Sequence, residues 1–178
     1  MKKTTKGKKT LPKIEIGSYH AGGIVFYIDE TGKHGFVMAP IRGLNLGSVE
    51  CEFYDSDLVQ WGPMGVDIAT TDDGPSNTDL ILASSPGMKT AASVCRDLTL
   101  NGYSDWYLPS NEEMGLLEEE LAEFDWYVAP WESDRYCDYW TSNQDYAHHA
   151  YTYRFDRREE FQTDRKDSIN FVLPIRDF

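Results

Sequence analysis

Apolar and polar positions along this chain of 178 residues predict strands near both ends and helices between them. Residues 22–28 and 35–39 are apolar runs separated by a polar turn, which is typical of a β-hairpin. Residues 150–155 and 168–176 also have strand-like sequence, and Pro174 places its position on a sheet edge or near the end of pairing. We expect the first and last strands to pair, which would bring both ends of the domain together.

Two helical segments are expected in the middle of the chain. The first begins near Asn77, where neighbouring side chains can cap its N–H groups, and Pro86 interrupts it before a stripe from Met88 to Leu98. The second follows Ser110, which forms a capping box with Glu113. The apolar stripe of the second helix consists of Met114, Leu117, Leu121 and Phe124.

Strands, then helices, then strands indicate an α+β fold with an antiparallel sheet. The polar stretch 41–76 and the aromatic stretch 126–145 are expected to be irregular, and 156–166 to be a charged turn. The length suits one domain, which we place at 14–178 behind a basic flexible arm at 1–13.

Charge divides the arm from the domain. The chain has 17 basic and 30 acidic residues, and the arm holds six of the basic ones and no acid, so the domain carries a formal charge of −19. Such a domain should repel nucleic acid, whereas the arm can bind an acidic protein assembly or fold back on the domain. The arm lysines are Lys2, Lys3, Lys6, Lys8, Lys9 and Lys13.

The sequence carries no cofactor or metal motif, so none is expected. Its three cysteines form no zinc pattern, and Cys95 lies on a helical apolar face, which favours a buried thiol. The acidic stretch 71–79 lacks the spacing of a calcium loop and is interpreted as a turn with a helix cap. His148 and His149 would point to opposite faces of a strand. No apolar run is long enough for a membrane span, and no secretion signal is recognisable.

Four segments resemble the Lcl C-terminal domain family of bacterial and phage surface proteins. They are the hairpin Gly23-Ile-Val-Phe-Tyr27 with Gly32-Lys-His-Gly-Phe-Val37, the Asn77-Thr78 to Cys95 segment, the run Gly102-Tyr-Ser-Asp-Trp-Tyr-Leu-Pro-Ser110, and Tyr139-Trp-Thr-Ser142 with the closing Pro174-Ile-Arg-Asp-Phe178. The resemblance implies a C-type lectin-like fold, in which two helices flank a small antiparallel sheet and long loops bear the ligand face. Residues 41–76 and much of 126–138 do not match, so no particular ligand carries over.

The region from Trp126 to His149 is the predicted ligand face, because rigid aromatic side chains are interleaved there with polar groups. Trp140 and Tyr139 are expected in the core instead. The predicted ligand-binding residues are Trp131, Asp134, Arg135, Tyr136, Asp138, Asn143, Gln144, Tyr146 and His148.

These features favour a non-enzymatic recognition or adhesion module that binds a glycan or a protein on a surface. No catalytic motif supports an enzyme, because there is no nucleophile elbow, no phosphate-binding glycine loop and no paired reactive cysteine. The alternative is a structural or decoration protein of a phage virion, anchored through the basic arm. The expected location is therefore a virion or a cell surface, and an oligomer is compatible with either function.

Overall fold

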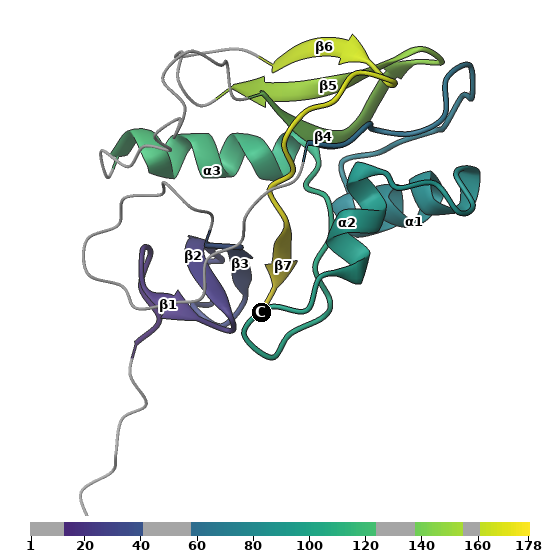
Figure 1. Ribbon diagram of the computed structural model, residues 1–178. Helices are drawn as coiled ribbons and strands as arrows, with labels where there is room; N and C mark the ends of the chain where they lie inside the picture. Colours follow the sequence, from purple (N-terminus) through teal and green to yellow (C-terminus); the bar gives the residue numbers. More distant parts are fainter. Residues whose placement is uncertain (1–12, 41–57, 124–137, 155–160) are drawn as a thin grey trace, which may run out of the picture.

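The computed structural model describes residues 13–40, 58–123, 138–154 and 161–178, which form three helices and two antiparallel sheets (Figure 1). The helices are α1 (Gly74–Ser84), α2 (Ala91–Asp97) and α3 (Asn111–Glu123). The strands are β1 (Tyr19–His20), β2 (Gly23–Ile28), β3 (Gly35–Met38), β4 (Asp138–Tyr146), β5 (His149–Arg154), β6 (Phe161–Arg165) and β7 (Ile175–Asp177). The α+β class predicted from the sequence is confirmed.

The first sheet joins the two ends of the domain. Its strand order is β1-β2-β3-β7, and every neighbouring pair is antiparallel. Val37 of β3 lies between Val25 of β2 and Arg176 of β7 in the register. The hairpin predicted at 22–28 and 35–39 is therefore present, and the C-terminal strand joins the same sheet. The expected direct pairing of the first and last strands is wrong, because β7 pairs with β3 instead of β2.

A β-bulge changes the face of the sheet to which the side chains of β2 point. Val25 pairs with Val37, but Tyr27 rather than Phe26 pairs with Phe36, so one extra residue lies between the two pairs. A bulge shifts the alternation of the residues that follow it. As a result Ile24, Phe26 and Tyr27 all pack on the face of the sheet that lies against α3.

The second sheet was only partly foreseen. It contains β4, β5 and β6, whereas the sequence predicted irregular structure through residue 145 and a turn at 156–166. Five consecutive residues of β4, from Tyr139 to Asn143, are buried, so the strand lacks the alternation on which a strand prediction depends. Strand β6 lies at the sheet edge with mostly exposed, polar residues, which gives no apolar pattern at all.

The C-terminal segment runs between the two sheets, as the yellow chain in Figure 1 shows. Phe171 forms a parallel bridge with Tyr139 of β4, and Ile175 then enters the first sheet beside Met38. The predicted strand at 168–176 is thus divided, and β7 occupies only its last part. Pro174, which has no N–H to donate, stands between the two pairings.

The first predicted helical segment is two separate helices. Helix α1 begins at Gly74, earlier than predicted, with Asp73 at its N-cap and Pro75 in its first turn, a position that suits proline. Helix α2 begins after Thr90, whose side chain forms a capping box with Ser93. The capping box predicted at the start of α3 is confirmed, because the backbone N–H of Glu113 donates to the Ser110 hydroxyl over 3.2 Å.

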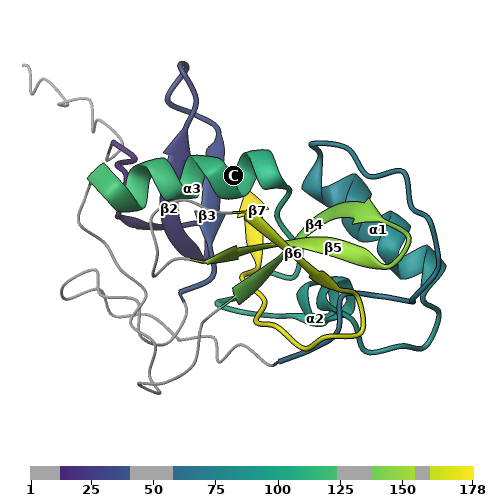
Figure 2. The same ribbon diagram turned by 90° about the horizontal axis from the view of Figure 1, so that it is seen from above.

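Three apolar clusters hold these elements together. Met114 and Leu117 of α3 pack with Ile24 and Phe26 of the first sheet and with Tyr139 of the second. Seen from above, α3 crosses the first sheet, while α1 and α2 lie by the second sheet, away from the hairpin of β2 and β3 (Figure 2). The second cluster joins α1 and α2 to β4 and β5, and the third covers the opposite face of the first sheet. Together the three clusters connect both sheets and all three helices of the described residues.

Two smaller expectations concern Cys95 and the membrane. Cys95 is a free, fully buried thiol as predicted, and burial raises its pKa far above the usual value. None of the helices in the described ranges is both long and apolar enough to cross a bilayer.

Candidate functional site

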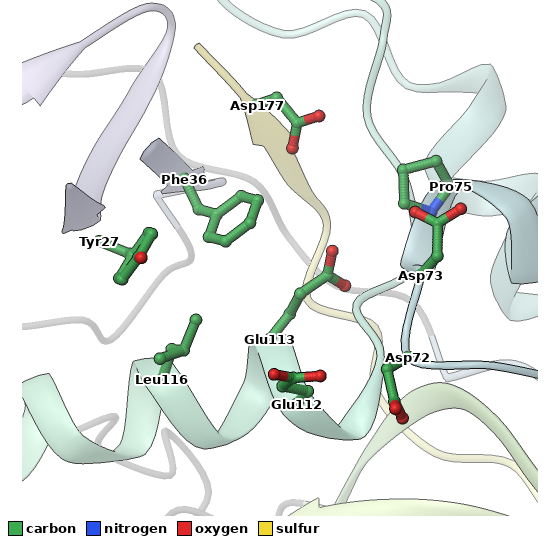
Figure 3. Close-up of a pocket in the computed structure, with 9 residues that line it drawn as sticks. All are labelled: Tyr27, Phe36, Asp72, Asp73, Pro75, Glu112, Glu113, Leu116 and Asp177. Atoms are coloured by element: carbon green, nitrogen blue, oxygen red, sulfur yellow. The ribbon is translucent and has the colours of Figure 1, made fainter. Parts of the chain in front are cut away.

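A pocket of about 400 Å³ opens where the first sheet, α3 and the start of α1 meet (Figure 3). It combines an apolar wall with five carboxylates. The apolar residues are Tyr27, Phe36, Pro75 and Leu116, and the acidic residues are Asp72, Asp73, Glu112, Glu113 and Asp177. Among the described residues that line it there is no lysine, arginine or histidine, so this part of the pocket is strongly electronegative.

The apolar wall depends on the bulge in β2. Because the bulge moves Tyr27 to the α3 side of the sheet, the Tyr27 ring stacks on that of Phe36, with centroids 5.3 Å apart. Phe36 also stacks on the buried ring of Phe26 over 5.9 Å. Leu116 of α3 packs beside them. The wall is therefore a fixed, half-buried surface against which the apolar part of a ligand can lie.

A buried amide network fixes the turn that carries Asp72 and Asp73. Thr71 donates its backbone N–H to Asn77 over 2.8 Å, and its carbonyl accepts hydrogen bonds from the amides of Asn77 and Asn143. Asn143 also accepts the backbone N–H of Asn111 at the start of α3. The same side chains thus hold the turn and the helix terminus, which lie next to each other in the pocket wall.

Glu113 lies at the centre of the site (Figure 3). One of its carboxylate oxygens, Oε2, accepts the backbone N–H of Ser110 over 2.7 Å, and Oε1 lies 3.1 Å from the hydroxyl of Tyr107. The same hydroxyl lies 2.7 Å from Oδ1 of Asp177 on β7. Tyr107 therefore connects two carboxylates that come from different elements.

Burial shifts the acid–base properties of this group. Loss of hydration raises the pKa of Glu113 to about 7, and the Asp177 charge adds to the shift, although hydrogen bonds from Ser110 and Tyr107 oppose it. Burial, followed by the charges of both carboxylates, raises the pKa of Tyr107 well above its usual value. The Tyr107 hydroxyl hence keeps its hydrogen near neutral pH, whereas the Glu113 carboxyl group titrates in that range.

Gly74 allows α1 to approach this network closely. A Cβ atom at this position would lie 2.8 Å from the Tyr107 ring and 2.9 Å from the Leu108 carbonyl, and it would also collide with the Glu113 carboxylate. Real Cβ atoms do not approach other atoms so closely, so glycine is required for the contact rather than for an unusual backbone angle. The start of α1 is consequently packed directly on the buried carboxylate.

The chemistry of the pocket suits an organic cation. In the described part of the chain, no group of three or more His, Cys, Asp or Glu side chains is arranged to hold a metal ion. An ammonium or guanidinium group instead needs carboxylates that accept hydrogen bonds, and aromatic faces attract its charge. The aliphatic stem that carries such a group in lysine or arginine can lie on the apolar wall.

The predicted ligand face is only partly within the described residues. Its residues Trp131, Asp134, Arg135 and Tyr136 lie outside them, as do the arm residues Lys2, Lys3, Lys6, Lys8 and Lys9. Their roles remain predictions. Lys13, the one arm lysine in the described ranges, is exposed.

Three described members of that face have internal partners. Asp138 forms a two-pronged ion pair with Arg154 across β4 and β5. Asn143 belongs to the amide network described above. Gln144 accepts hydrogen bonds from the Ile68 N–H and the Lys166 ammonium group. These side chains therefore contribute to the framework of the domain, and their role in ligand binding remains a prediction.

Tyr146 and His148 remain open to solvent at the β4–β5 turn. Tyr146 is 51% exposed, and its ring lies against that of His149 with centroids 4.6 Å apart. His148 is exposed as well. Trp140 and Tyr139, in contrast, are buried, which confirms the expectation that they belong to the core.

Sequence reasoning missed the acidic pocket because each of its members has an ordinary local explanation. Asp73 is an N-cap, Glu113 completes a capping box, and Asp177 ends a strand. The one local signal is a glutamate in a capping box, three residues beyond a specific Leu-Pro-Ser run. The sequence could not show that this glutamate meets a tyrosine and a second carboxylate.

Comparison with known proteins found no family model that matches the chain and no curated protein with significant similarity to it.

Proposed function

We propose that this chain is a non-enzymatic recognition module that binds a basic segment of a partner protein. The observation that carries the proposal is the pocket in which five carboxylates face a wall with two stacked aromatic rings (Figure 3). A lysine or arginine side chain matches both features, since its stem is apolar and its end is a cation with N–H donors. A neutral glycan would leave most of these negative charges without a counterpart.

The fold assignment is part of the same proposal. A C-type lectin-like arrangement is supported by the pairing of β3 with the C-terminal β7 and by helices packed beside small antiparallel sheets. Surface modules of this kind carry their ligand sites on a scaffold in which strands from both ends of the domain lie in one sheet. The proposed location, a virion or cell surface, follows from the resemblance of the Tyr103-Ser-Asp-Trp-Tyr-Leu-Pro-Ser110 run.

The first test measures binding of the full chain to the peptide acetyl-(Gly-Lys)₃-amide by NMR titration at low salt. We expect shifts at Tyr27, Phe36 and Leu116, and about tenfold weaker binding when Asp72 and Asp73 are both changed to asparagine. Asparagine also caps helices well, so α1 should be retained. Raising the salt to 500 mM should weaken binding, because the charges on the pocket rim are exposed.

The matched control is the double variant Asp97→Asn with Asp145→Asn. Both residues are exposed and neither lines the pocket, so the net charge changes equally while the site is preserved. Equal loss of affinity in the two double variants would mean that the effect comes from the net charge of the chain, and it would contradict binding in the pocket. Binding of neutral glycans in place of the basic peptide would overturn the proposal in favour of a lectin.

A second candidate function is a structural or decoration protein that docks through its arm on an acidic protein surface, as in a virion. It is favoured by the six lysines of residues 1–13 beside a domain of charge −19. Other copies of the domain offer such a surface. We expect the chain to self-associate in sedimentation velocity at 20 mM salt and to dissociate at 500 mM, since exposed charges are screened. Changing all six lysines to glutamine should abolish the association, and a monomer at both salt concentrations would contradict this function.

A further inference from the structure

The hydroxyl of Tyr107 cannot satisfy both carboxylates that it contacts. It carries one hydrogen, yet Oε1 of Glu113 lies 3.1 Å away and Oδ1 of Asp177 lies 2.7 Å away. Glu113 is 93% buried, and within the described residues Tyr107 is the group that contacts Oε1. When both carboxylates are ionised and Tyr107 donates to Asp177 over the shorter distance, a buried oxygen facing the pocket has no hydrogen.

Two sources can supply the missing hydrogen. The first is a proton on Oε1 of Glu113, which then donates to the Tyr107 oxygen while Tyr107 donates to Asp177. The second is an N–H group of a ligand in the pocket, which donates to Oε1 directly. A buried carboxylate without a donor is costly, so each source makes the other unnecessary.

We propose that the pocket exchanges a proton on Glu113 for the N–H group of a bound ammonium or guanidinium ion. This inference rests on the proposed function and specifies its ligand chemistry and its regulation. On binding, the O–H bond of Glu113 is broken and the proton leaves to solvent, while the cation takes its place beside the carboxylate. Charge within the pocket is thereby conserved.

The surroundings of Glu113 favour this exchange on every side. Asp177 faces it from β7, Asp72 and Asp73 from the turn before α1, and Glu112 from its own helix, so the charged neighbours in the described part of the pocket are all negative. Each of them favours a proton on Glu113 when the pocket is empty. Each also attracts an incoming cation, and the positive charge of that cation then favours the ionised form of Glu113.

The exchange makes binding depend on pH in a defined direction. The pKa of Glu113 is raised to about 7 in the empty pocket, so binding below that pH must displace a proton. Affinity should therefore rise with pH and level off above pH 8. We expect binding at pH 8 to be about tenfold tighter than at pH 6, because below the pKa each pH unit changes the competition tenfold. None of the described lining residues is a histidine that could produce the same effect.

A matched pair of ligands tests the need for an N–H donor. The probes are n-butylammonium and butyltrimethylammonium, which share the chain and the charge but differ in N–H groups. NMR titration of the full chain should show pH-dependent binding of the first and weaker, nearly pH-independent binding of the second. Equal affinities with equal pH dependence would contradict a role for the N–H donor.

Two neighbouring variants identify the residue that holds the proton. Glu113→Gln keeps the capping-box acceptor but cannot release a proton, so the affinity for n-butylammonium should become constant between pH 6 and pH 8. Glu112→Gln removes the same charge from the pocket without a contact to Tyr107, and it should keep the tenfold ratio. A ratio that persists in Glu113→Gln and disappears in Asp177→Asn would place the proton on Asp177 and overturn the inference.

The outcomes separate this inference from the function on which it rests. Binding of basic peptides that is independent of pH would preserve the proposed function and reject the proton exchange. Absence of binding by either probe and by the peptide would reject both. Observation of the Glu113 carboxyl ¹³C signal across the same pH range provides a readout that does not depend on affinity, since the titration midpoint should fall when n-butylammonium is bound.

Discussion

Replacing Trp140 with alanine is expected to lower the free energy of unfolding by about 3–5 kcal/mol, the usual cost of removing a buried aromatic side chain. Trp140 is fully buried between the second sheet and the two short helices, and its indole N–H donates to the Val59 carbonyl over 2.7 Å. Trp61 returns the contact, because its own indole N–H donates to the Thr141 carbonyl over 2.8 Å. The two indoles thus hold the 59–61 segment against β4.

Urea denaturation followed by far-ultraviolet circular dichroism measures the effect without relying on tryptophan fluorescence. The matched control is Tyr146→Ala, since Tyr146 belongs to the same strand but is 51% exposed, and its loss should cost less than about 1 kcal/mol. Trp140→Phe should fall between the two variants because the ring remains while the N–H group is lost. Similar losses for Trp140→Ala and Tyr146→Ala would contradict the placement of Trp140 in the core.

Local patterns in the sequence predicted those parts of the fold that local physics determines. The hairpin of β2 and β3 follows from two apolar runs around a polar turn, and the start of α3 follows from the capping box of Ser110 and Glu113. Both signals lie within a few residues, so no tertiary information is needed to read them. The burial of Trp140 was also predictable because strand-like sequence follows it directly.

The missed strands show where tertiary context decides. Strand β4 is buried on both faces, since the second cluster covers one side and α3 the other, and its sequence therefore lacks a period of two. Strand β6 has the opposite problem, because an exposed edge needs no apolar residues. In each case the partner strand, rather than the residues themselves, determines the structure.

The candidate site was unpredictable for a related reason. Tyr27 reaches the pocket only because a bulge shifts it to the α3 side of the sheet, and a bulge is a property of the pairing between two strands. Asp72 and Asp177 are more than one hundred residues apart and meet at the pocket through the closure of the domain by β7. A sequence can reveal that carboxylates are present, but their convergence is a result of topology.

Replacing Lys166 with methionine is expected to lower the free energy of unfolding by about 2 kcal/mol at pH 7, because its hydrogen-bond acceptors lose their donor. Lys166 is fully buried, and its ammonium group donates to the Val66 carbonyl over 2.7 Å and to the Gln144 side chain. It also lies 4.6 Å from the centre of the Trp61 ring. The control is Arg165→Met, whose exposed ion pair with Asp167 should contribute less than about 1 kcal/mol.

The difference between the wild type and Lys166→Met should increase as the pH rises from 7.5 to 9.5. Burial lowers the pKa of Lys166 from its ordinary 10.5 to about 8, although the charge of Asp67 opposes the shift. Between these values the unfolded chain binds more protons than the folded one, so the free energy of unfolding of the wild type rises with pH, by about 1–2 kcal/mol over this interval. A neutral amine still has two hydrogens, enough for both the Val66 carbonyl and Gln144. A difference that shrinks over this range in urea denaturation would mean that Lys166 is held as a stabilised cation, with its hydrogen bonds and the Trp61 ring outweighing the cost of burial.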